Sequence, residues 1–138
     1  GRPVHVGPSG TGQLAKLANQ GIVGITIGAI AEAMLLLEKG GANPAAIRDA
    51  LSGGFADSTI LQLHGARMTN DDLGARAKAA IQLKDMNNIM EEAHNLGLSL
   101  PMSADIQSRF NTLCCDMGLG GLDHATLFLE LLSRNPKD

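Results

Sequence analysis

The stretch TGQLAKLANQGIVGITIGAIAEAMLLLEKG, residues 11–40, decides the fold of this chain. Between Ile22 and Leu37 it is apolar on nearly every side, and the interruptions are chiefly small residues and Glu32. A helix at a protein surface carries a polar stripe, whereas a helix that is apolar all round is buried. The stretch therefore predicts one long helix in the centre of the molecule, with the other helices packed around it.

A membrane-spanning helix is the alternative interpretation of so apolar a segment. The uncharged run, however, covers only residues 17–31, includes two amides, and falls short of the roughly 20 apolar residues that a bilayer requires. We therefore expect a core helix and no contact with a membrane. Small residues recur along it at a spacing that would let another helix approach closely: Gly21, Gly24 and Gly28.

Caps and breakers divide the remainder of the chain into further helices. Gly40 and Gly41 end the first helix, and later glycines provide most of the other connections. The expected helices run from Pro44 to about Leu51, after the cap Ser58 through Met68, from about Ala75 to Leu96, from Pro101 to about Met117, and after the cap Asp123 to about Ser133. Long helices with short connections predict an all-α fold, a helical bundle built around one long buried helix.

The composition is that of a single soluble domain without a nucleic-acid partner. The 138 residues fit one core, the formal net charge is -3, and the basic residues are scattered. The absence of Trp and Tyr argues against stacking platforms for single-stranded nucleic acid. Neighbouring cysteines in a helix do not readily bridge to each other, so Cys114 and Cys115 indicate reduced thiols and a cytoplasmic location. No secretory signal pattern is visible at the N-terminus.

A polar face precedes the apolar part of the first helix. The segment GPSGTGQLAKLANQ, residues 7–20, joins a glycine-rich turn to the helix start and displays Lys16, Asn19 and Gln20. Side chains three and four positions apart lie one turn from each other, so an ammonium group and two amides share one face. This face lies near the positive end of the helix dipole. We interpret it as a surface that holds a small polar substrate.

The pattern GxGxxxKxxNQ, which ends at Gln20, resembles the opening of the second domain of the β-hydroxyacid dehydrogenases. The likeness continues in the family's order through AEAMLLLEKGG (31–41), LKD (83–85), LP (100–101) and GGLDHATL (120–127). This family includes the hydroxyisobutyrate dehydrogenases and tartronate semialdehyde reductases, within the 6-phosphogluconate dehydrogenase-like superfamily. The resemblance covers nearly the whole chain.

The resemblance implies the C-terminal catalytic and substrate domain of an NAD(P)-dependent oxidoreductase for a small β-hydroxyacid or its semialdehyde. Relatives carry an upstream Rossmann domain, so we expect this chain to lack that domain and to be inactive alone. Residues 1–10 would be the end of the interdomain strand and a glycine-rich turn, and residues 11–138 the all-helical substrate and dimerisation domain. NAD or NADP would be bound mainly by the missing N-terminal domain, which leaves the choice between them open. Expected partners are the hydroxyacid, that domain, and further copies in a homodimer or homotetramer.

The resemblance also implies roles for residues of this chain. Lys16 matches the catalytic lysine, which donates a proton to the carbonyl oxygen of the substrate as hydride arrives from the nicotinamide. Asn19 and Gln20 match residues that orient the substrate, although amides in such places also satisfy nearby backbone groups, and that alternative stays open. Lys84 matches a lysine near the cofactor and substrate. A simple helical ion pair does not explain it, since no acidic residue lies four positions before or after it.

Two further basic residues, Arg76 and Lys78, are candidates for facing an anionic substrate or a cofactor phosphate. The histidines at positions 5, 64, 94 and 124 lie far apart and share no ligand spacing, so we expect no metal site. The alternative function is a stand-alone helical dimerisation or ligand-binding module without catalysis, and the presence of Lys16 argues against it.

Overall fold

The computed structural model describes residues 11–136, and no strand forms within that range. Its elements are, in chain order, α1 (Thr11–Lys39), α2 (Pro44–Leu51), α3 (Thr59–Thr69), α4 (Ala79–Asn95), α5 (Pro101–Asn111), the π-helix η1 (Thr112–Asp116), the 3-10 helix η2 (His124–Thr126) and α6 (Leu127–Ser133). The predicted all-α fold is confirmed. The interdomain strand and glycine-rich turn predicted for residues 1–10 lie outside the described residues.

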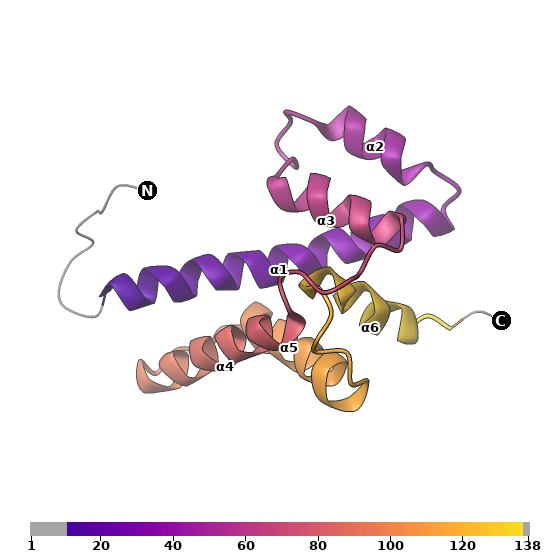
Figure 1. The fold of residues 1–138 in the computed structure, drawn as a ribbon. Helices are drawn as coiled ribbons and strands as arrows, with labels where there is room; N and C mark the ends of the chain where they lie inside the picture. The colour runs from indigo at the N-terminus through magenta and orange to yellow at the C-terminus, as the bar shows by residue number, and fades with distance from the viewer. Residues whose placement is uncertain (1–10, 137–138) are drawn as a thin grey trace.

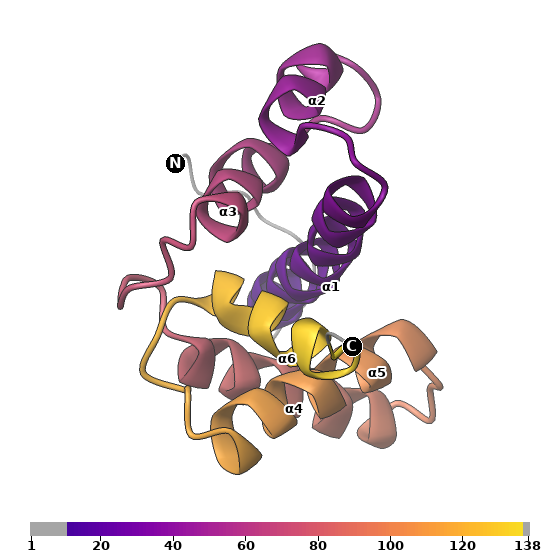
Figure 2. The same cartoon turned by 90° about the vertical axis from the view of Figure 1, so that its right-hand side faces the viewer.

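The long helix α1 is the axis around which the other helices are arranged (Figure 1). α2 and α3 lie on one side of its C-terminal half, whereas α4, α5 and α6 lie on the opposite side (Figure 2). The core forms where α1 meets both groups, and its largest fully buried apolar side chains are Phe110, Ile27, Met34, Met86, Leu113 and Leu127. The predicted bundle around one long helix is therefore the observed architecture.

The remaining helices of this chain cover only part of α1. Ile27 and Met34 are buried, but Ile22 and Leu36 are 66% and 74% exposed. By length and hydropathy α1 would also suffice to cross a membrane, yet 44% of its most apolar window is buried among the other helices. This burial favours a core helix with one further apolar side that the helices within residues 11–136 leave uncovered.

The glycines of α1 allow α4 and α5 to approach closely, as their spacing predicts. A Cβ atom on Gly24 would lie 2.9 Å from Nε2 of Gln82 and 3.0 Å from the sulfur of Met86. A Cβ atom on Gly28 would lie 2.6 Å from Cδ1 of Ile106. A Cβ atom at either position would force the ends of these neighbouring side chains to move, so the glycines let α4 and α5 pack directly against α1.

The predicted caps are confirmed, but one predicted helix start is wrong. Asn43, Ser58 and Asp123 each accept hydrogen bonds from backbone N–H groups at the start of the following helix. The helix expected from about Ala75 begins at Ala79. Ala77 and Lys78 are held instead by the distant Asp123 segment, and the capping carboxylate itself accepts the N–H of Ala77 over 3.1 Å. This long-range contact has no local signal in the sequence.

The helix predicted to run from Pro101 to about Met117 changes its winding before it ends. It is an α-helix to Asn111 and then widens into the π-turn η1, in which the N–H of Met117 bonds the carbonyl of Thr112 over 2.9 Å. A π-turn adds one residue to the turn and shifts the faces of the residues that follow. The 3.6-residue periodicity on which the prediction rested does not reveal such a change.

Candidate functional site

Two polar side chains of α1 are hydrogen-bonded to each other, and one of them also bonds the neighbouring helix α4. Nε2 of Gln20 donates to Oδ2 of Asp85 over 2.8 Å, and Oε1 of the same Gln20 accepts from Nδ2 of Asn19 over 3.1 Å. The structure therefore brings the two predicted substrate-binding amides together and adds a carboxylate to them. Their hydrogen bonds run between side chains, so the alternative that these amides serve only the local backbone does not describe this arrangement.

A second glutamine, on α4, bonds the backbone of α1 beside this polar group. Gln82 on α4 is buried to 2% exposure, and its Nε2 donates to the backbone carbonyl of Gln20 over 2.9 Å. A mid-helix carbonyl normally accepts only within its own helix, so this extra bond fixes α4 against α1 beside the amides. Sequence reasoning missed this residue, since a glutamine within a helix is usually exposed.

The two lysines predicted to act in catalysis and cofactor binding are both exposed. Lys16 lies one turn before Gln20, and within residues 11–136 it takes part in no ion pair. Lys84 is adjacent to Asp85, but on a helix it projects about 200° from the buried Gln82 and so faces away from α1. The structure thus groups Lys16 with the amides and leaves Lys84 apart from them. The roles of both lysines remain predictions.

Arg76 is paired within its own segment. Its guanidinium makes two bonds to the carboxylate of Asp72, of 2.8 and 2.9 Å, and this pair is exposed on both sides. Such a bidentate pair compensates the charge of Arg76. Lys78, at the start of α4, is exposed and forms no ion pair among the described residues. Of the two candidate anion-facing residues, only Lys78 keeps an uncompensated charge.

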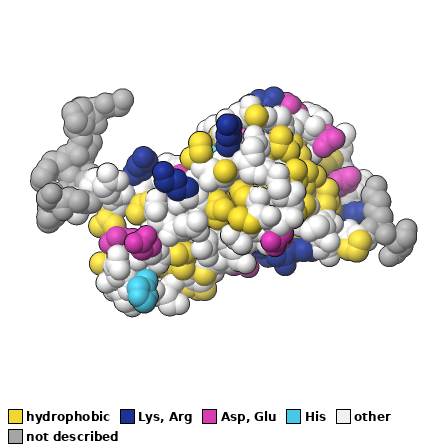
Figure 3. All heavy atoms as spheres, turned by 60° about the horizontal axis from the view of Figure 1, so that its bottom comes forward, with side chains coloured by type: hydrophobic (Ala, Val, Ile, Leu, Met, Phe, Trp, Pro, Cys, Tyr) yellow, Lys and Arg dark blue, Asp and Glu magenta, His cyan; other side chains and the backbone are white. Residues whose placement is uncertain are grey.

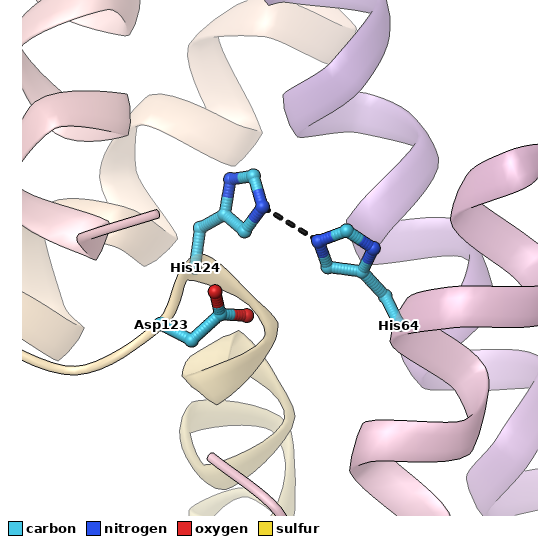
Figure 4. Close-up of side chains that lie close together, drawn as sticks. All are labelled: His64, Asp123 and His124. Atoms are coloured by element: carbon cyan, nitrogen blue, oxygen red, sulfur yellow. Dashed lines mark hydrogen bonds between the residues drawn. The ribbon is translucent and has the colours of Figure 1, made fainter. Parts of the chain in front are cut away.

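A second polar cluster lies where α3 meets η2, away from the polar group of α1 and α4. Nε2 of His64 and Nε2 of His124 are 2.6 Å apart, with the fully buried carboxylate of Asp123 beside them (Figure 4). Burial lowers the pKa of His64 to about 4, with a smaller contribution from the neighbouring His124, against the opposing effect of Asp123. Burial also lowers the pKa of His124. The sequence separation of these residues hid their contact.

An apolar groove of about 280 Å³ runs along the N-terminal half of α1, between it and α4 and α5. Its walls are mainly Leu, Ile and Ala side chains, among them the exposed Ile22 and Leu96. Apolar side chains also gather in patches between charged ones on the face drawn in Figure 3. A groove with so few polar groups cannot orient a small hydroxyacid, which needs placed hydrogen-bond partners. It suits an apolar protein surface.

Comparison with known proteins places these observations in a family. Residues 10–131 match the family model described as NAD-binding of NADP-dependent 3-hydroxyisobutyrate dehydrogenase. The 2-hydroxy-3-oxopropionate reductase of Escherichia coli is 44% identical over 94% of this chain and 45% of its own length. A probable mitochondrial 3-hydroxyisobutyrate dehydrogenase-like protein of Arabidopsis thaliana is 31% identical over 95% of this chain and 39% of its own. The chain thus spans less than half the length of these relatives.

Solved structures agree on the fold. The 3-hydroxyisobutyrate dehydrogenase of Salmonella typhimurium superposes with a TM-score of 0.80 at 24% identity, over 87% of this chain and 42% of that one. The Mycobacterium tuberculosis 3-hydroxyisobutyrate dehydrogenase, solved with L-serine, gives 0.83 at 23% identity, over 93% and 46%. Likeness at this identity establishes the fold and nothing beyond it. The family model and the E. coli relative confirm the predicted resemblance: the chain belongs to the 3-hydroxyisobutyrate dehydrogenase family of β-hydroxyacid dehydrogenases.

Proposed function

We propose that this chain is the catalytic and substrate domain of an NAD(P)-dependent oxidoreductase that acts on a small β-hydroxyacid or its semialdehyde. The observation that carries the proposal is the hydrogen-bonded group of Asn19, Gln20 and Asp85, one helical turn from the exposed ammonium of Lys16. The relative at 44% identity, a 2-hydroxy-3-oxopropionate reductase, favours tartronate semialdehyde over hydroxyisobutyrate as the substrate type.

In this proposal Lys16 is the proton donor. A carbonyl that accepts hydride develops negative charge on its oxygen, and a nearby ammonium stabilises that charge and then transfers a proton to it. Lys16 is exposed in this chain, so water would compete with the substrate for its N–H groups. The site therefore needs a cover that excludes water, which a second domain closing over α1 would provide.

Asn19 and Gln20 would hold the polar groups of the substrate. One N–H of the Gln20 amide donates to Asp85, and its oxygen accepts one hydrogen bond from Asn19. One further N–H and one further acceptor position of this amide are therefore left for the substrate. Asn19 uses a single N–H in this group, so its carbonyl oxygen and second N–H are available. An arrangement with fixed donors and acceptors matches the hydroxyl and carboxylate of a small hydroxyacid.

The nicotinamide dinucleotide supplies the hydride, and we propose that a second, dinucleotide-binding domain holds most of it. Residues 11–136 contain no strand and thus no βαβ phosphate-binding unit. We therefore expect this chain to contact only the nicotinamide end of the cofactor, next to the substrate. Lys84, exposed on the side of α4 turned away from α1, is the residue of this chain that we expect to contact it. The choice between NAD and NADP would belong to the second domain.

We also propose a homodimer or homotetramer. The exposed apolar side chains of α1, Ile22 and Leu36, together with the apolar groove beside α4, support further burial in an assembly. A cytoplasmic location is proposed with it, and the free thiols of Cys114 and Cys115 support a reducing compartment.

The experiment that tests the function is a hydride-transfer assay on this chain joined to its dinucleotide-binding domain. Tartronate semialdehyde and the oxidised form of 3-hydroxyisobutyrate are each offered with NADH and with NADPH, and absorbance of the reduced nicotinamide is followed. Turnover of at least one substrate supports the proposal, and a higher kcat/KM for tartronate semialdehyde supports the substrate type. A folded two-domain protein that consumes neither substrate contradicts the proposal and favours a helical binding module.

A further inference from the structure

Two histidines with no shared spacing in the sequence meet in the fold. His64 lies on α3 and His124 begins η2, 60 residues later, with their Nε2 atoms 2.6 Å apart (Figure 4). The carboxylate of Asp123 completes a group whose ligand atoms all lie within 4.8 Å of one another. We propose that His64, His124 and Asp123 form a binding site for a divalent transition-metal ion, and we take zinc as the example.

The geometry of the two rings is close to that of two histidines that bind one metal ion. Imidazole nitrogens bind zinc at about 2.0–2.1 Å in a tetrahedral arrangement, which places two ligating nitrogens about 3.3 Å apart. The rings are inclined by 56° with centroids 4.5 Å apart, so they are not stacked, and their Nε2 atoms face each other. A rotation that separates the Nε2 atoms by about 0.7 Å brings the two nitrogens to that spacing.

Asp123 contributes charge and one acceptor position. Oδ1 accepts from Arg67 and from the N–H of Ala77, and Oδ2 accepts from the N–H of Ala125. A carboxylate offers about four acceptor positions, so one remains on Oδ2 for the ion or for a water bound to it. Two histidines and one carboxylate leave the fourth position of a tetrahedral ion for water.

The environment of the pair favours neutral imidazole. Burial lowers the pKa of both imidazoles, Arg67 lowers it further and Asp123 opposes this. Neutral imidazole is the form that binds metal. It prefers zinc, copper and nickel, whereas magnesium and calcium prefer oxygen ligands throughout.

Two features limit the affinity and can be tested. The guanidinium of Arg67, 3.3 Å from Asp123, repels an incoming cation. Nδ1 of His64 is buried and finds no partner in the described part of the chain, so the hydrogen bond that usually supports a ligating histidine is missing. We therefore expect a site of moderate affinity that Arg67→Gln strengthens.

Zinc binding by the whole chain, freed of metal by a chelator, tests the proposal by calorimetry near neutral pH. A Cys114→Ser/Cys115→Ser background removes competition from the thiols. We expect a single zinc ion per chain. His64→Gln and His124→Gln should each weaken binding about tenfold or more, and Arg67→Gln should tighten it. His94→Gln is the matched control, because that histidine is exposed on α4 and should not contribute.

Imidazole ¹⁵N chemical shifts of the chain with all four histidines intact give a readout that does not depend on whether the variants fold. Zinc should shift the Nε2 resonances of His64 and His124 and leave those of His94 in place. No saturable binding, binding that survives both His64→Gln and His124→Gln, or shifts at His94 alone would each overturn the proposal.

Discussion

The side chain of Gln20 on α1 donates a hydrogen bond from Nε2 to Oδ2 of Asp85 on α4, over 2.8 Å. A carboxylate accepts hydrogen bonds and cannot donate them, so this contact determines which end of the Gln20 amide faces α4. The amide oxygen is thereby turned to accept from Asn19. The two predicted substrate-binding amides are thus held in one orientation by a residue on another helix.

Substitution of Asp85 should loosen this group and the contact between the two helices. Asp85→Ala removes the acceptor of a partly buried, charge-assisted bond and should lower the free energy of unfolding by about 1 kcal/mol. Asp85→Asn keeps an oxygen acceptor and should recover part of the loss. Urea denaturation measures both. Identical midpoints for Asp85→Ala and the unsubstituted chain would mean that the bond adds nothing to stability.

The close approach of helices at Gly24 predicts intolerance of a side chain there. Gly24→Val would place atoms against Gln82 and Met86 and should lower the free energy of unfolding by about 2 kcal/mol through overpacking. Gly12→Ala, in the first turn of the same helix, is the control, because a Cβ atom there meets nothing within 4 Å. Thermal unfolding compares the two. A Gly24→Val variant as stable as Gly12→Ala would show that α4 and α5 pack less closely than described.

The buried histidine pair predicts that the domain loses stability in mild acid. The pKa of His64 is lowered to about 4, whereas an unfolded histidine has a pKa of about 6.5, so the unfolded chain binds a proton that the folded chain does not. The stability this provides is complete above pH 6.5 and declines as pH falls towards 4. We expect the free energy of unfolding to fall by about 1–2 kcal/mol across that window. This is half of the full linkage value, because screening by solvent reduces the effect.

Denaturation at a series of pH values measures this effect on the metal-free protein. His64→Gln cannot titrate, so its stability should change less over the same window, whereas His94→Gln should follow the unsubstituted chain. Equal pH profiles for His64→Gln and the unsubstituted chain would assign the acid sensitivity to other groups.

Much of the fold was predictable because its signals are local. The apolar run of α1 lies in one continuous segment, and caps such as Asn43 and Ser58 act on the next few residues. The start of α4 was not predictable, because Ala77 and Lys78 are held by Asp123 from the other end of the chain. The π-turn η1 was missed as well, since the 3.6-residue periodicity does not reveal one added residue in a turn.

The candidate site was predictable in part. The spacing of Lys16, Asn19 and Gln20 places them on one face, and the family pattern directs attention to them. The contact of Gln20 with Asp85 and that of His64 with His124 join residues 65 and 60 positions apart. Pairings at such separations follow from helix packing alone, which spacing within one helix cannot reveal.

Lys16 is the proposed proton donor, and the hydride-transfer rate of Lys16→Ala in the chain joined to its dinucleotide-binding domain tests this role. Lys39→Ala, at the other end of the same helix and also exposed, is the matched control. We expect a fall in kcat of about 10²-fold or more for Lys16→Ala, with unchanged unfolding and a normal rate for Lys39→Ala. Equal rates for the two variants would contradict it.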